Sequence, residues 1–558
     1  MVLLITAALV PAVLTPKDMR DFAAQLLGAI TFTSNVVLWT QTGYFAAPAV
    51  TKPLLHMWSL SLEEQYYLLV PIAMVLLPRK WWKSTVWTVF AISLALCLAF
   101  SASKPGATFF LLPTRAWELL LGCLAALGAL PSSMPAFARR ATWPAVAVIV
   151  LLPVFPCGLP HPGVDALAVC MATLVVLCAA HPHLGVNPIS RALARLGDMS
   201  YSLYLVHWPL GALAASVWLT GQPQEARWAL LAATFPASWL LYRYVEMPAR
   251  KAPASRRILL LLAAGTAVLV VVALALYQAG SRDAKLDEAG GGNLGLADTC
   301  EYADAFSNRR ECRTSESPRM MLWGDSQAMH LADGLAGFEG GVVQATKTTC
   351  GPLLGLSALR EQARYDQTWA RGCVSFNDSV LDHLKTASHI EVVVLSSWFS
   401  QYLEGGALIR DGAGLVDGTT NPGRAFKALQ STAVALRSIG KRVILVGPAP
   451  SSGFDVARCL DAARLGKVRL GMDSATCEIS EEKFKENFSG VLRLLDRIER
   501  ENVVPVIRLD RSLCSAGKCV VQEGQTPLYV DGGHFSHAGS RIVGTKLQLA
   551  TRAFAQAR

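Results

Sequence analysis

Residues 319–326 read Arg-Met-Met-Leu-Trp-Gly-Asp-Ser, and this stretch decides the fold of the second half of the chain. A short apolar run ends in Gly-Asp-Ser, and a segment compatible with a helix follows, from Gln327 to Leu335. This order places Ser326 at the carboxyl end of a strand, where open α/β sheets hold their functional sites. Because Gly-Asp-Ser also recurs by chance, its meaning depends on partners elsewhere in the chain.

Those partners occur some 200 residues later, in residues 529–536, Tyr-Val-Asp-Gly-Gly-His-Phe-Ser. A serine hydroxyl is a weak nucleophile and needs a base that a carboxylate orients. Asp531 and His534 supply both, so the sequence predicts a catalytic triad with Ser326. In the simpler alternative Ser326 only caps the following helix, and the Asp531–His534 pair argues against that alternative.

Around these motifs, short β-branched runs alternate with amphipathic segments. Strands are predicted at 319–323, 341–345, 390–395, 442–446 and 503–508, and helices near 374–386, 423–438, 480–500 and 538–553. Such alternation is typical of an α/β fold with a doubly wound parallel sheet.

The first half of the chain has a different composition. With 52% hydrophobic and 16% charged residues, the whole chain is too apolar for one soluble domain. Residues 1–280 contain 18 Lys and Arg against 9 Asp and Glu, whereas residues 281–558 contain 33 against 32. The basic charge therefore belongs to the apolar half, where cytoplasmic loops favour Lys and Arg. No basic-aromatic patch indicates a nucleic-acid partner.

Apolar segments predict a multi-pass helical membrane domain. The predicted spans are 64–78, 83–101, 108–130, 143–157, 163–181, 200–219, 227–245 and 257–279. Basic clusters on alternate loops mark the cytoplasmic side, so everything after the last span is expected outside the cytoplasm. Residues 1–15 are interpreted as the back half of a span whose start is missing, and residues 22–40 as an interfacial or re-entrant helix.

Cysteines divide in the same way. Five lie in apolar stretches, and eight follow residue 281: Cys300, Cys312, Cys350, Cys373, Cys459, Cys477, Cys514 and Cys519. An even number in a domain beyond a membrane favours disulfides, with pairing between sequence neighbours as the simplest connectivity. Metal binding is the alternative, but no Cys-x-x-Cys repeat supports it.

Polar residues in or beside the spans are candidates for function because they are costly in a membrane. The candidates are His56, Glu63, Glu64, Arg115, Glu118 and His207. Structural ion pairs that hold the helices together are the alternative, and for Arg243 with Glu246, at a helix end, this alternative is at least as good.

With these motifs in view, the chain resembles membrane acyltransferases of the acyltransferase type 3 family that carry a fused C-terminal SGNH domain. The matching segments are Trp-Ser-Leu-Ser-Leu-Glu-Glu-Gln at 58–65, Arg-Ala-Trp-Glu-Leu-Leu-Leu-Gly at 115–122, Ser-Tyr-Ser-Leu-Tyr-Leu-Val-His-Trp-Pro at 200–209, and Tyr-Val-Glu-Met-Pro at 244–248, together with the triad motifs. The resemblance implies an acyltransferase-like membrane domain at 1–250, a linking membrane helix at 251–280, a periplasmic linker at 281–317 and an SGNH domain at 318–558.

The resemblance also implies a function. Such proteins O-acetylate envelope polysaccharides such as lipopolysaccharide O-antigen, with acetyl-CoA as cytoplasmic donor and no tightly bound cofactor or metal. The protein would lie in a bacterial inner membrane, with its SGNH domain in the periplasm. On this pattern Ser326 takes the acyl group, His534 is the base and Asp531 orients it. A membrane-anchored SGNH esterase is the first alternative, and a non-catalytic envelope protein the second.

The chain departs from the family pattern in three places. The first two spans of the family, which carry its proposed donor-handling motif, are missing here, and we expect a start upstream of Met1. The residue after the nucleophile is Gln327 where the family often has His. The strand ending at 395 is followed by Ser-Ser-Trp instead of the asparagine that would donate to the oxyanion. Gly351 is the candidate for a replacement donor.

Overall fold

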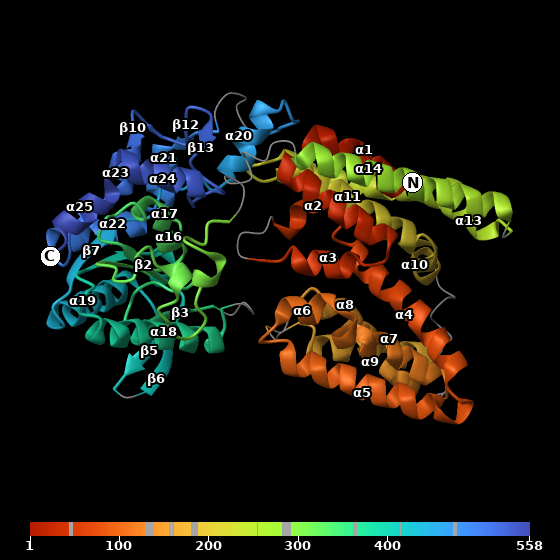
Figure 1. Ribbon diagram of the computed structural model, residues 1–558. Helices are drawn as coiled ribbons and strands as arrows, with labels where there is room; N and C mark the ends of the chain where they lie inside the picture. The colour runs from red at the N-terminus through yellow and green to blue at the C-terminus, as the bar shows by residue number, and fades with distance from the viewer. Residues whose placement is uncertain are drawn as a thin grey trace. The chain divides into compact units, whose positions relative to one another are not determined.

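The structure is a computed structural model that describes residues 1–43, 48–128, 138–155, 158, 161–179, 188–253, 255–281, 292–360, 365–412, 414–471 and 477–558. The chain forms two compact units, residues 1–282 and 283–558, which are described one at a time (Figure 1).

The second unit is built on a five-stranded parallel sheet in the order β2-β1-β4-β7-β9. Its strands are β1 (Met320–Gly324), β2 (Val342–Thr346), β4 (Val392–Ser396), β7 (Arg442–Val446) and β9 (Val506–Ile507). The three inner strands and β2 are buried almost throughout, which explains their continuous apolar runs. The predicted doubly wound parallel sheet is confirmed.

Helices cover both faces of this sheet (Figure 1). On one face α17 (Ala332–Leu335) packs with α24 (His537–Lys546) and α25 (Leu549–Gln556), and on the other lie α18 (Gln367–Thr386) and α19 (Pro422–Ser438). Helix α19 also packs with α22 (Ser489–Arg500), which follows α21 (Glu481–Asn487). The helices predicted at 480–500 and 538–553 are therefore each two helices.

The sheet order places a topological switch point at β1. Strand β1 pairs with β2 on one side and β4 on the other, so the chain leaves β1 in one direction and later returns past it in the other. Gly324 ends β1 where a Cβ would lie 1.8 Å from the Ser396 carbonyl oxygen, so only glycine fits. The helix α16 (Ser326–Met329) begins directly after this close contact.

The predicted linker at 281–317 is folded into the second unit over its described part, from residue 292. Residues 301 and 313 form isolated bridges with β2, and Tyr302 is buried in the core. The Gly-rich residues 290 and 291 lie outside the described residues.

Smaller antiparallel sheets decorate this core. They consist of β3 (Leu356–Leu359), β5 (Gly406–Asp411) and β6 (Gly414–Thr419); of β8 (Ile479–Ser480), β10 (Cys514–Ser515) and β11 (Lys518–Cys519); and of β12 (Gln522–Glu523) with β13 (Thr526–Pro527). Disulfides join Cys300 to Cys312, Cys350 to Cys373, Cys459 to Cys477 and Cys514 to Cys519. The predicted pairing of sequence neighbours is confirmed at all eight positions.

The first unit is helical. Its main helices are α1 (Val2–Val13), α2 (Pro16–Ile30), α3 (Ser34–Thr40), α4 (Met57–Leu76), α5 (Trp82–Phe100), α6 (Pro105–Phe110), α7 (Leu112–Ala126), α8 (Thr142–Leu151), α9 (Val164–Ala179), α10 (Pro188–Asp198), α11 (Ser200–Val217), α12 (Gln224–Leu241) and α14 (Arg256–Ser281). Between α12 and α14 lie a π-helical turn (Tyr242–Glu246) and α13 (Met247–Lys251).

Among the described residues, three helical segments are long and apolar enough to cross a membrane: Arg79–Phe100, Pro105–Ala126 and Arg256–Ser281. Of the other predicted spans, α8 and α9 are shorter apolar helices within the described residues, while α4, α11 and α12 have sufficient length but a more polar composition. Parts of the spans predicted at 143–157 and 163–181 lie outside the described residues.

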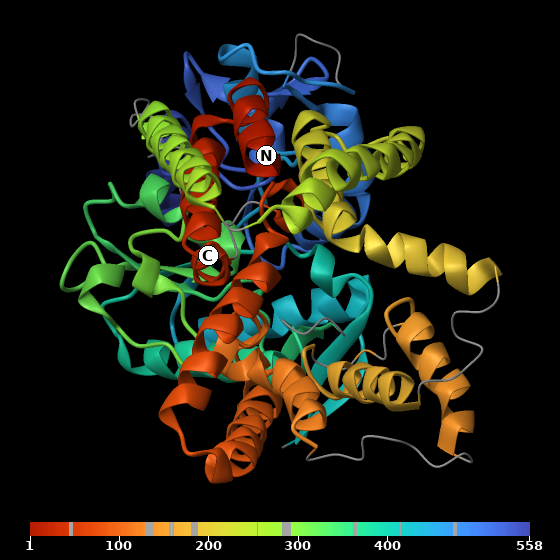
Figure 2. The same ribbon diagram turned by 90° about the vertical axis from the view of Figure 1, so that its right-hand side faces the viewer.

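A core cluster centres on α2, including Phe22, Ala23 and Leu26, and it includes Leu276 of α14. Figure 2 shows the red N-terminal helices beside the yellow-green α14, and a Cβ at Gly280 would lie 2.5 Å from the Pro16 carbonyl oxygen. The single helix predicted at 22–40 is instead α2 and α3, because the chain turns at Phe32, whose φ is +55°.

Candidate active site

The structure brings Ser326, His534 and Asp531 together in hydrogen-bonding order. Ser326 Oγ lies 2.8 Å from His534 Nε2, and His534 Nδ1 lies 2.8 Å from Asp531 Oδ2. Ser326 is the first residue of α16 at the switch point, while the two partners lie in the loop before α24. This is the geometry in which a serine donates its proton to an imidazole that a carboxylate orients.

The catalytic loop, residues 531–535, is closed by hydrogen bonds from its backbone to the Asp531 side chain. Asp531 Oδ1 accepts hydrogen bonds from the N–H groups of Gly533 and His534, each at 2.8 Å. Burial alone would raise the pKa of Asp531, but His534 and these two N–H groups hold that pKa below its ordinary value of 3.8. The carboxylate therefore stays ionised and fixes the proton on His534 Nδ1.

Asp325, beside the nucleophile, is a fully buried brace. Its carboxylate caps α16 by accepting from the Gln327 N–H, and its other oxygen accepts from Ser397 Oγ, the Trp398 N–H and Gln401 Nε2. Burial raises its pKa against the effect of these donors. Asp325 thus ties the nucleophile to the loop after β4.

Two further buried residues on the nucleophile side contact the catalytic loop. Gln327 Nε2 donates to the Gly533 carbonyl at 3.1 Å, and Gln327 Oε1 accepts from the Ala449 N–H at 3.0 Å. His330 Nδ1 accepts from the Phe535 N–H at 3.3 Å. Burial, with His534 nearby, lowers the pKa of His330 well below its ordinary value. Fully buried and neutral, His330 is a packing residue.

The predicted oxyanion donor is engaged elsewhere in this structure. The Gly351 N–H donates to the Tyr402 hydroxyl at 2.7 Å, and the Gly351 carbonyl accepts from Asn377 at 2.9 Å. A role for Gly351 in the oxyanion hole would require the first bond to break, so this role stays a prediction. Trp398 belongs to the Ser-Ser-Trp segment that stands in place of the family's asparagine. Its ring stacks on that of His534, with 6.0 Å between the ring centroids.

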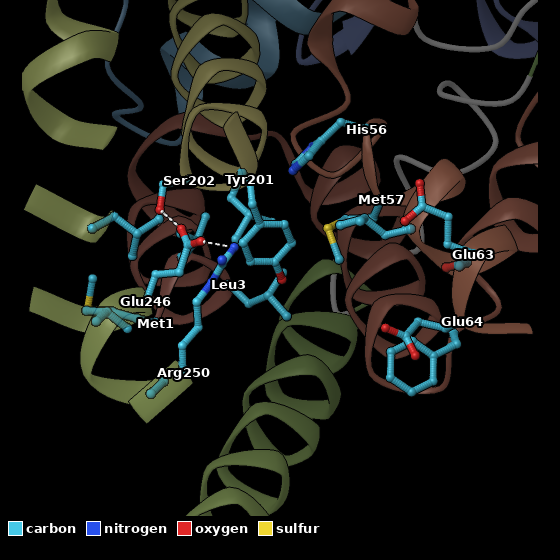
Figure 3. Close-up of a pocket in the computed structure, with 18 of the residues that line it drawn as sticks. Met1, Leu3, His56, Met57, Glu63, Glu64, Tyr201, Ser202, Glu246 and Arg250 are labelled. Atoms are coloured by element: carbon cyan, nitrogen blue, oxygen red, sulfur yellow. Dashed lines mark hydrogen bonds and ion pairs between the residues drawn. The ribbon is translucent and has the colours of Figure 1, made fainter. Parts of the chain in front are cut away.

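In the first unit, His56, Glu63 and Glu64 line a cavity of about 760 Å³ (Figure 3). His56 is 4% exposed, and neither of its ring nitrogens has a hydrogen-bond partner among the described residues. Figure 3 shows Glu63 and Glu64 on one side of the cavity and the group of Ser202, Glu246 and Arg250 on the other. A buried histidine without a partner beside a cavity is costly, so His56 stays a candidate for function.

None of the other three polar candidates in this unit, Arg115, Glu118 and His207, lines the cavity. Arg115 Nη1 lies 2.9 Å from Glu118 Oε1, and the Arg115 guanidinium lies over the Trp58 ring. His207 is exposed, and its Nδ1 lies 3.0 Å from the Leu203 carbonyl oxygen. Its ring centroid is 6.2 Å from that of His56, so of these three residues only His207 lies close to the cavity wall.

A structural ion pair between Arg243 and Glu246 was one of two alternatives, and Glu246 forms its ion pair with Arg250 instead. Glu246 Oε1 instead lies 2.6 Å from Arg250 Nη2, and Glu246 Oε2 accepts from Ser202 Oγ at 2.5 Å. The reason is geometric, since Arg243 and Glu246 lie three apart in a π-helical turn, which is wider than an α-helical turn, whereas Arg250 follows Glu246 by four residues.

Tyr204 is a polar residue that the sequence did not single out. Its hydroxyl lies 2.5 Å from Ser59 Oγ and donates to the His56 carbonyl at 2.5 Å. The signal was present, since Tyr204 lies in the matching segment at 200–209, three residues before His207. It joins α11 to the start of α4, where His56 lies.

Comparisons with known proteins agree with this architecture. Residues 22–243 match the family described as an acyltransferase domain, and residues 299–548 match the family described as an SGNH domain fused to acyltransferase type 3 (AT3) domains. The chain therefore belongs to the proteins that join these two domains.

Individual relatives cover part of the chain. BcsY of Komagataeibacter xylinus, named as a membrane-bound transacylase, is 32% identical over 252 residues, which are 44% of this chain and 64% of that protein. The peptidoglycan O-acetyltransferase OatA of Listeria monocytogenes is 26% identical over 260 residues, or 42% of each chain. The O-acetyltransferase OatA of Staphylococcus aureus is 26% identical over 273 residues. This chain thus spans less than two thirds of the length of these relatives.

Proposed function

We propose that this protein transfers an acyl group, acetyl in the first instance, to a hydroxyl of a cell-envelope polysaccharide. The observation that carries the proposal is the Ser326–His534–Asp531 geometry in an SGNH domain on the same chain as an acyltransferase domain. Relatives named as O-acetyltransferases support the reaction, and the one named for peptidoglycan supports a glycan acceptor.

The chemistry follows from the triad. Ser326 Oγ attacks the carbonyl of the incoming acyl group while His534 Nε2 takes the hydroxyl proton. His534 then returns that proton to the leaving group, so the acyl group is bonded to Ser326. In the second half-reaction a glycan hydroxyl gives its proton to His534 and attacks the acyl carbonyl, and Ser326 leaves with that proton. Ionised Asp531 stabilises the imidazolium in both half-reactions. The Ser326 backbone N–H is our first candidate for a hydrogen-bond donor to the oxyanion.

The donor side belongs to the first unit. We propose acetyl-CoA in the cytoplasm as donor, and passage of the acyl group through the first unit near the cavity of His56, Glu63 and Glu64. An inner-membrane location with the second unit outside the cytoplasm is supported by its four disulfides, since such bonds persist in oxidising compartments.

A Ser326→Ala variant in the native host tests the proposal. Ester-linked acetate on isolated envelope polysaccharides is measured by NMR before and after mild base. Loss of acetate at one sugar position is expected, and it would identify the acceptor. A gain of acetate would instead make the protein an esterase, because water can replace the glycan hydroxyl in the same triad. No change in any glycan fraction would overturn both.

A further inference from the structure

The segment of residues 292–297, which follows the first unit along the chain, contacts Phe535, the residue after the catalytic histidine. Asn293 is the twelfth residue after Ser281, the last residue of α14. It is fully buried in the second unit, and Nδ2 donates to the carbonyls of Phe535 at 3.2 Å and His330 at 3.4 Å. One side chain therefore joins the end of the nucleophile helix to the loop that carries the catalytic base.

Phe535, which follows the catalytic histidine, has both of its backbone polar groups held from outside its loop. Its N–H donates to His330 Nδ1, and its carbonyl accepts from Asn293 Nδ2. On the inner side of the same loop, the Val530 N–H donates to the His534 carbonyl at 2.9 Å. The backbone on either side of the His534 side chain is thus fixed, and Asn293 supplies the outermost of these contacts.

The 292–297 segment is itself firmly attached to the sheet. Gln344, fully buried on β2, donates from Nε2 to the Leu294 carbonyl at 2.7 Å and accepts the Leu296 N–H on Oε1 at 2.9 Å. Gly295 between them has a φ of +89°, and a Cβ there would lie 2.1 Å from Gln344 Oε1. Asn293 Oδ1 accepts from the Gly295 N–H at 3.0 Å, so every part of the Asn293 amide is bonded.

We propose that Asn293 is a positioning residue for His534, and that the catalytic unit therefore begins at the 292–297 segment, upstream of the region that matches the SGNH family. Loss of the Asn293 amide would leave two carbonyls without their donor and would free the outer side of the catalytic loop. Because triad catalysis depends on sub-ångström placement of the base, the reactivity of Ser326 should fall even where the protein folds. This inference rests on the triad of the proposed function.

The test measures how fast Ser326 of the full-length protein, in isolated membranes, reacts with a fluorophosphonate. In this reaction the serine oxygen bonds to phosphorus, fluoride leaves, and His534 takes the hydroxyl proton. The final extent of labelling reports the folded fraction, and the rate constant reports the triad in each folded molecule. A merely structural role would change the extent and leave the rate constant unchanged.

Asn293→Ala is expected to lower the rate constant roughly ten-fold or more, and Asn293→Ser, which keeps one donor, to lower it less. The matched control is Thr432→Ala, because Thr432 is also fully buried and bonds backbone, accepting from the Leu354 N–H at 3.0 Å. This control should lower only the extent of labelling.

A wild-type rate constant in Asn293→Ala would overturn the inference, as would an equal fall in Thr432→Ala. If Asn293→Ala does not accumulate, a wild-type rate constant in Asn293→Ser overturns it. Labelling of Ser326→Ala at the wild-type rate would show instead that the triad assignment itself fails, so the two failures are distinguishable.

Discussion

At the scale of single residues, Gln327 joins two loops that meet at the triad. Its amide donates to Gly533 in the catalytic loop and accepts from Ala449 after β7, and the side chain is fully buried. Gln327→Ala would leave the buried Ala449 N–H unpaired, at a cost of about 1–3 kcal/mol. We expect slower phosphonylation of Ser326, by roughly ten-fold, in the fluorophosphonate assay.

The isosteric variant Gln327→Glu separates the two contacts of the side chain. An ionised glutamate still accepts from the Ala449 N–H but places negative charge against the Gly533 carbonyl. Phosphonylation of Ser326 in Gln327→Glu should therefore slow at least as much as in Gln327→Ala. Rates close to wild type in both variants would contradict the role of Gln327.

The triad could be predicted from the sequence, whereas most of its supports could not. Ser326 was indicated by the strand before it, and His534 by its short spacing from Asp531. Such signals are local in the chain. The partners of Gln327 lie 122 and 206 residues away, and nothing local to Gln327 indicates either. The 292–297 segment was interpreted as linker for the same reason, since Asn293 finds its partner 242 residues later.

At the scale of elements, the start of α24 is joined to α17 by a histidine–carboxylate pair. His537 Nδ1 lies 2.5 Å from Asp333 Oδ2, and Arg541 lies 3.8 Å from the other oxygen of that carboxylate. The hydrogen bond that His537 donates to Asp333 raises the pKa of His537 above its ordinary 6.5, against the effects of burial and of Arg541, and the Gly292 backbone adds to the rise. The protonated ring therefore favours the folded state.

This pair makes stability depend on pH. A histidine whose pKa is higher in the folded than in the unfolded state contributes stability that is fully present below its unfolded pKa of about 6.5 and is lost as pH rises through the folded pKa. Because the pair is partly exposed, its effect is small. Between about pH 6 and pH 8, we expect the thermal midpoint of the second unit to fall by on the order of 2 °C more in wild type than in His537→Gln.

Scanning calorimetry of the full-length protein in detergent measures this difference. Asp333→Asn is a second variant for the same comparison, since it keeps the shape of the side chain and removes its charge. The two variants should show the same reduced pH dependence. Equal slopes in wild type and in both variants would contradict the contribution of this pair.

Element types followed from the sequence more readily than element ends. The five strands lie within a few residues of their predicted positions, because runs of β-branched and aliphatic residues between turns are distinctive. The predicted helix at 480–500 is broken at Phe488. Phe488 is apolar and lies four positions after Phe484, so the helical pattern of the sequence continues across the break. The second break, at Gln548 with φ of +49°, likewise has no glycine to mark it.

At the scale of the whole molecule, a transferase and an anchored esterase require different properties of the first unit. An anchor needs apolar helices. It does not need a buried histidine whose ring nitrogens find no partner among the described residues, beside a cavity with two glutamates. The cost of burying His56 without a partner argues that the first unit takes part in the reaction.

Replacement of His56 tests this argument. If acyl groups reach Ser326 through the first unit, His56→Gln should lower polysaccharide acetylation by on the order of 100-fold or more. The same variant should leave the fluorophosphonate reaction of Ser326 unchanged, because that probe needs only the triad. Ser216→Ala is the control, since within the described part of the chain this buried hydroxyl bonds only the Ala212 carbonyl of its own helix, and the variant should retain both activities. Full acetylation by His56→Gln would mean that acyl groups do not pass by His56. Loss of both activities would mean that the variant disturbs the triad itself, and with it the proposed division of the reaction between the two units.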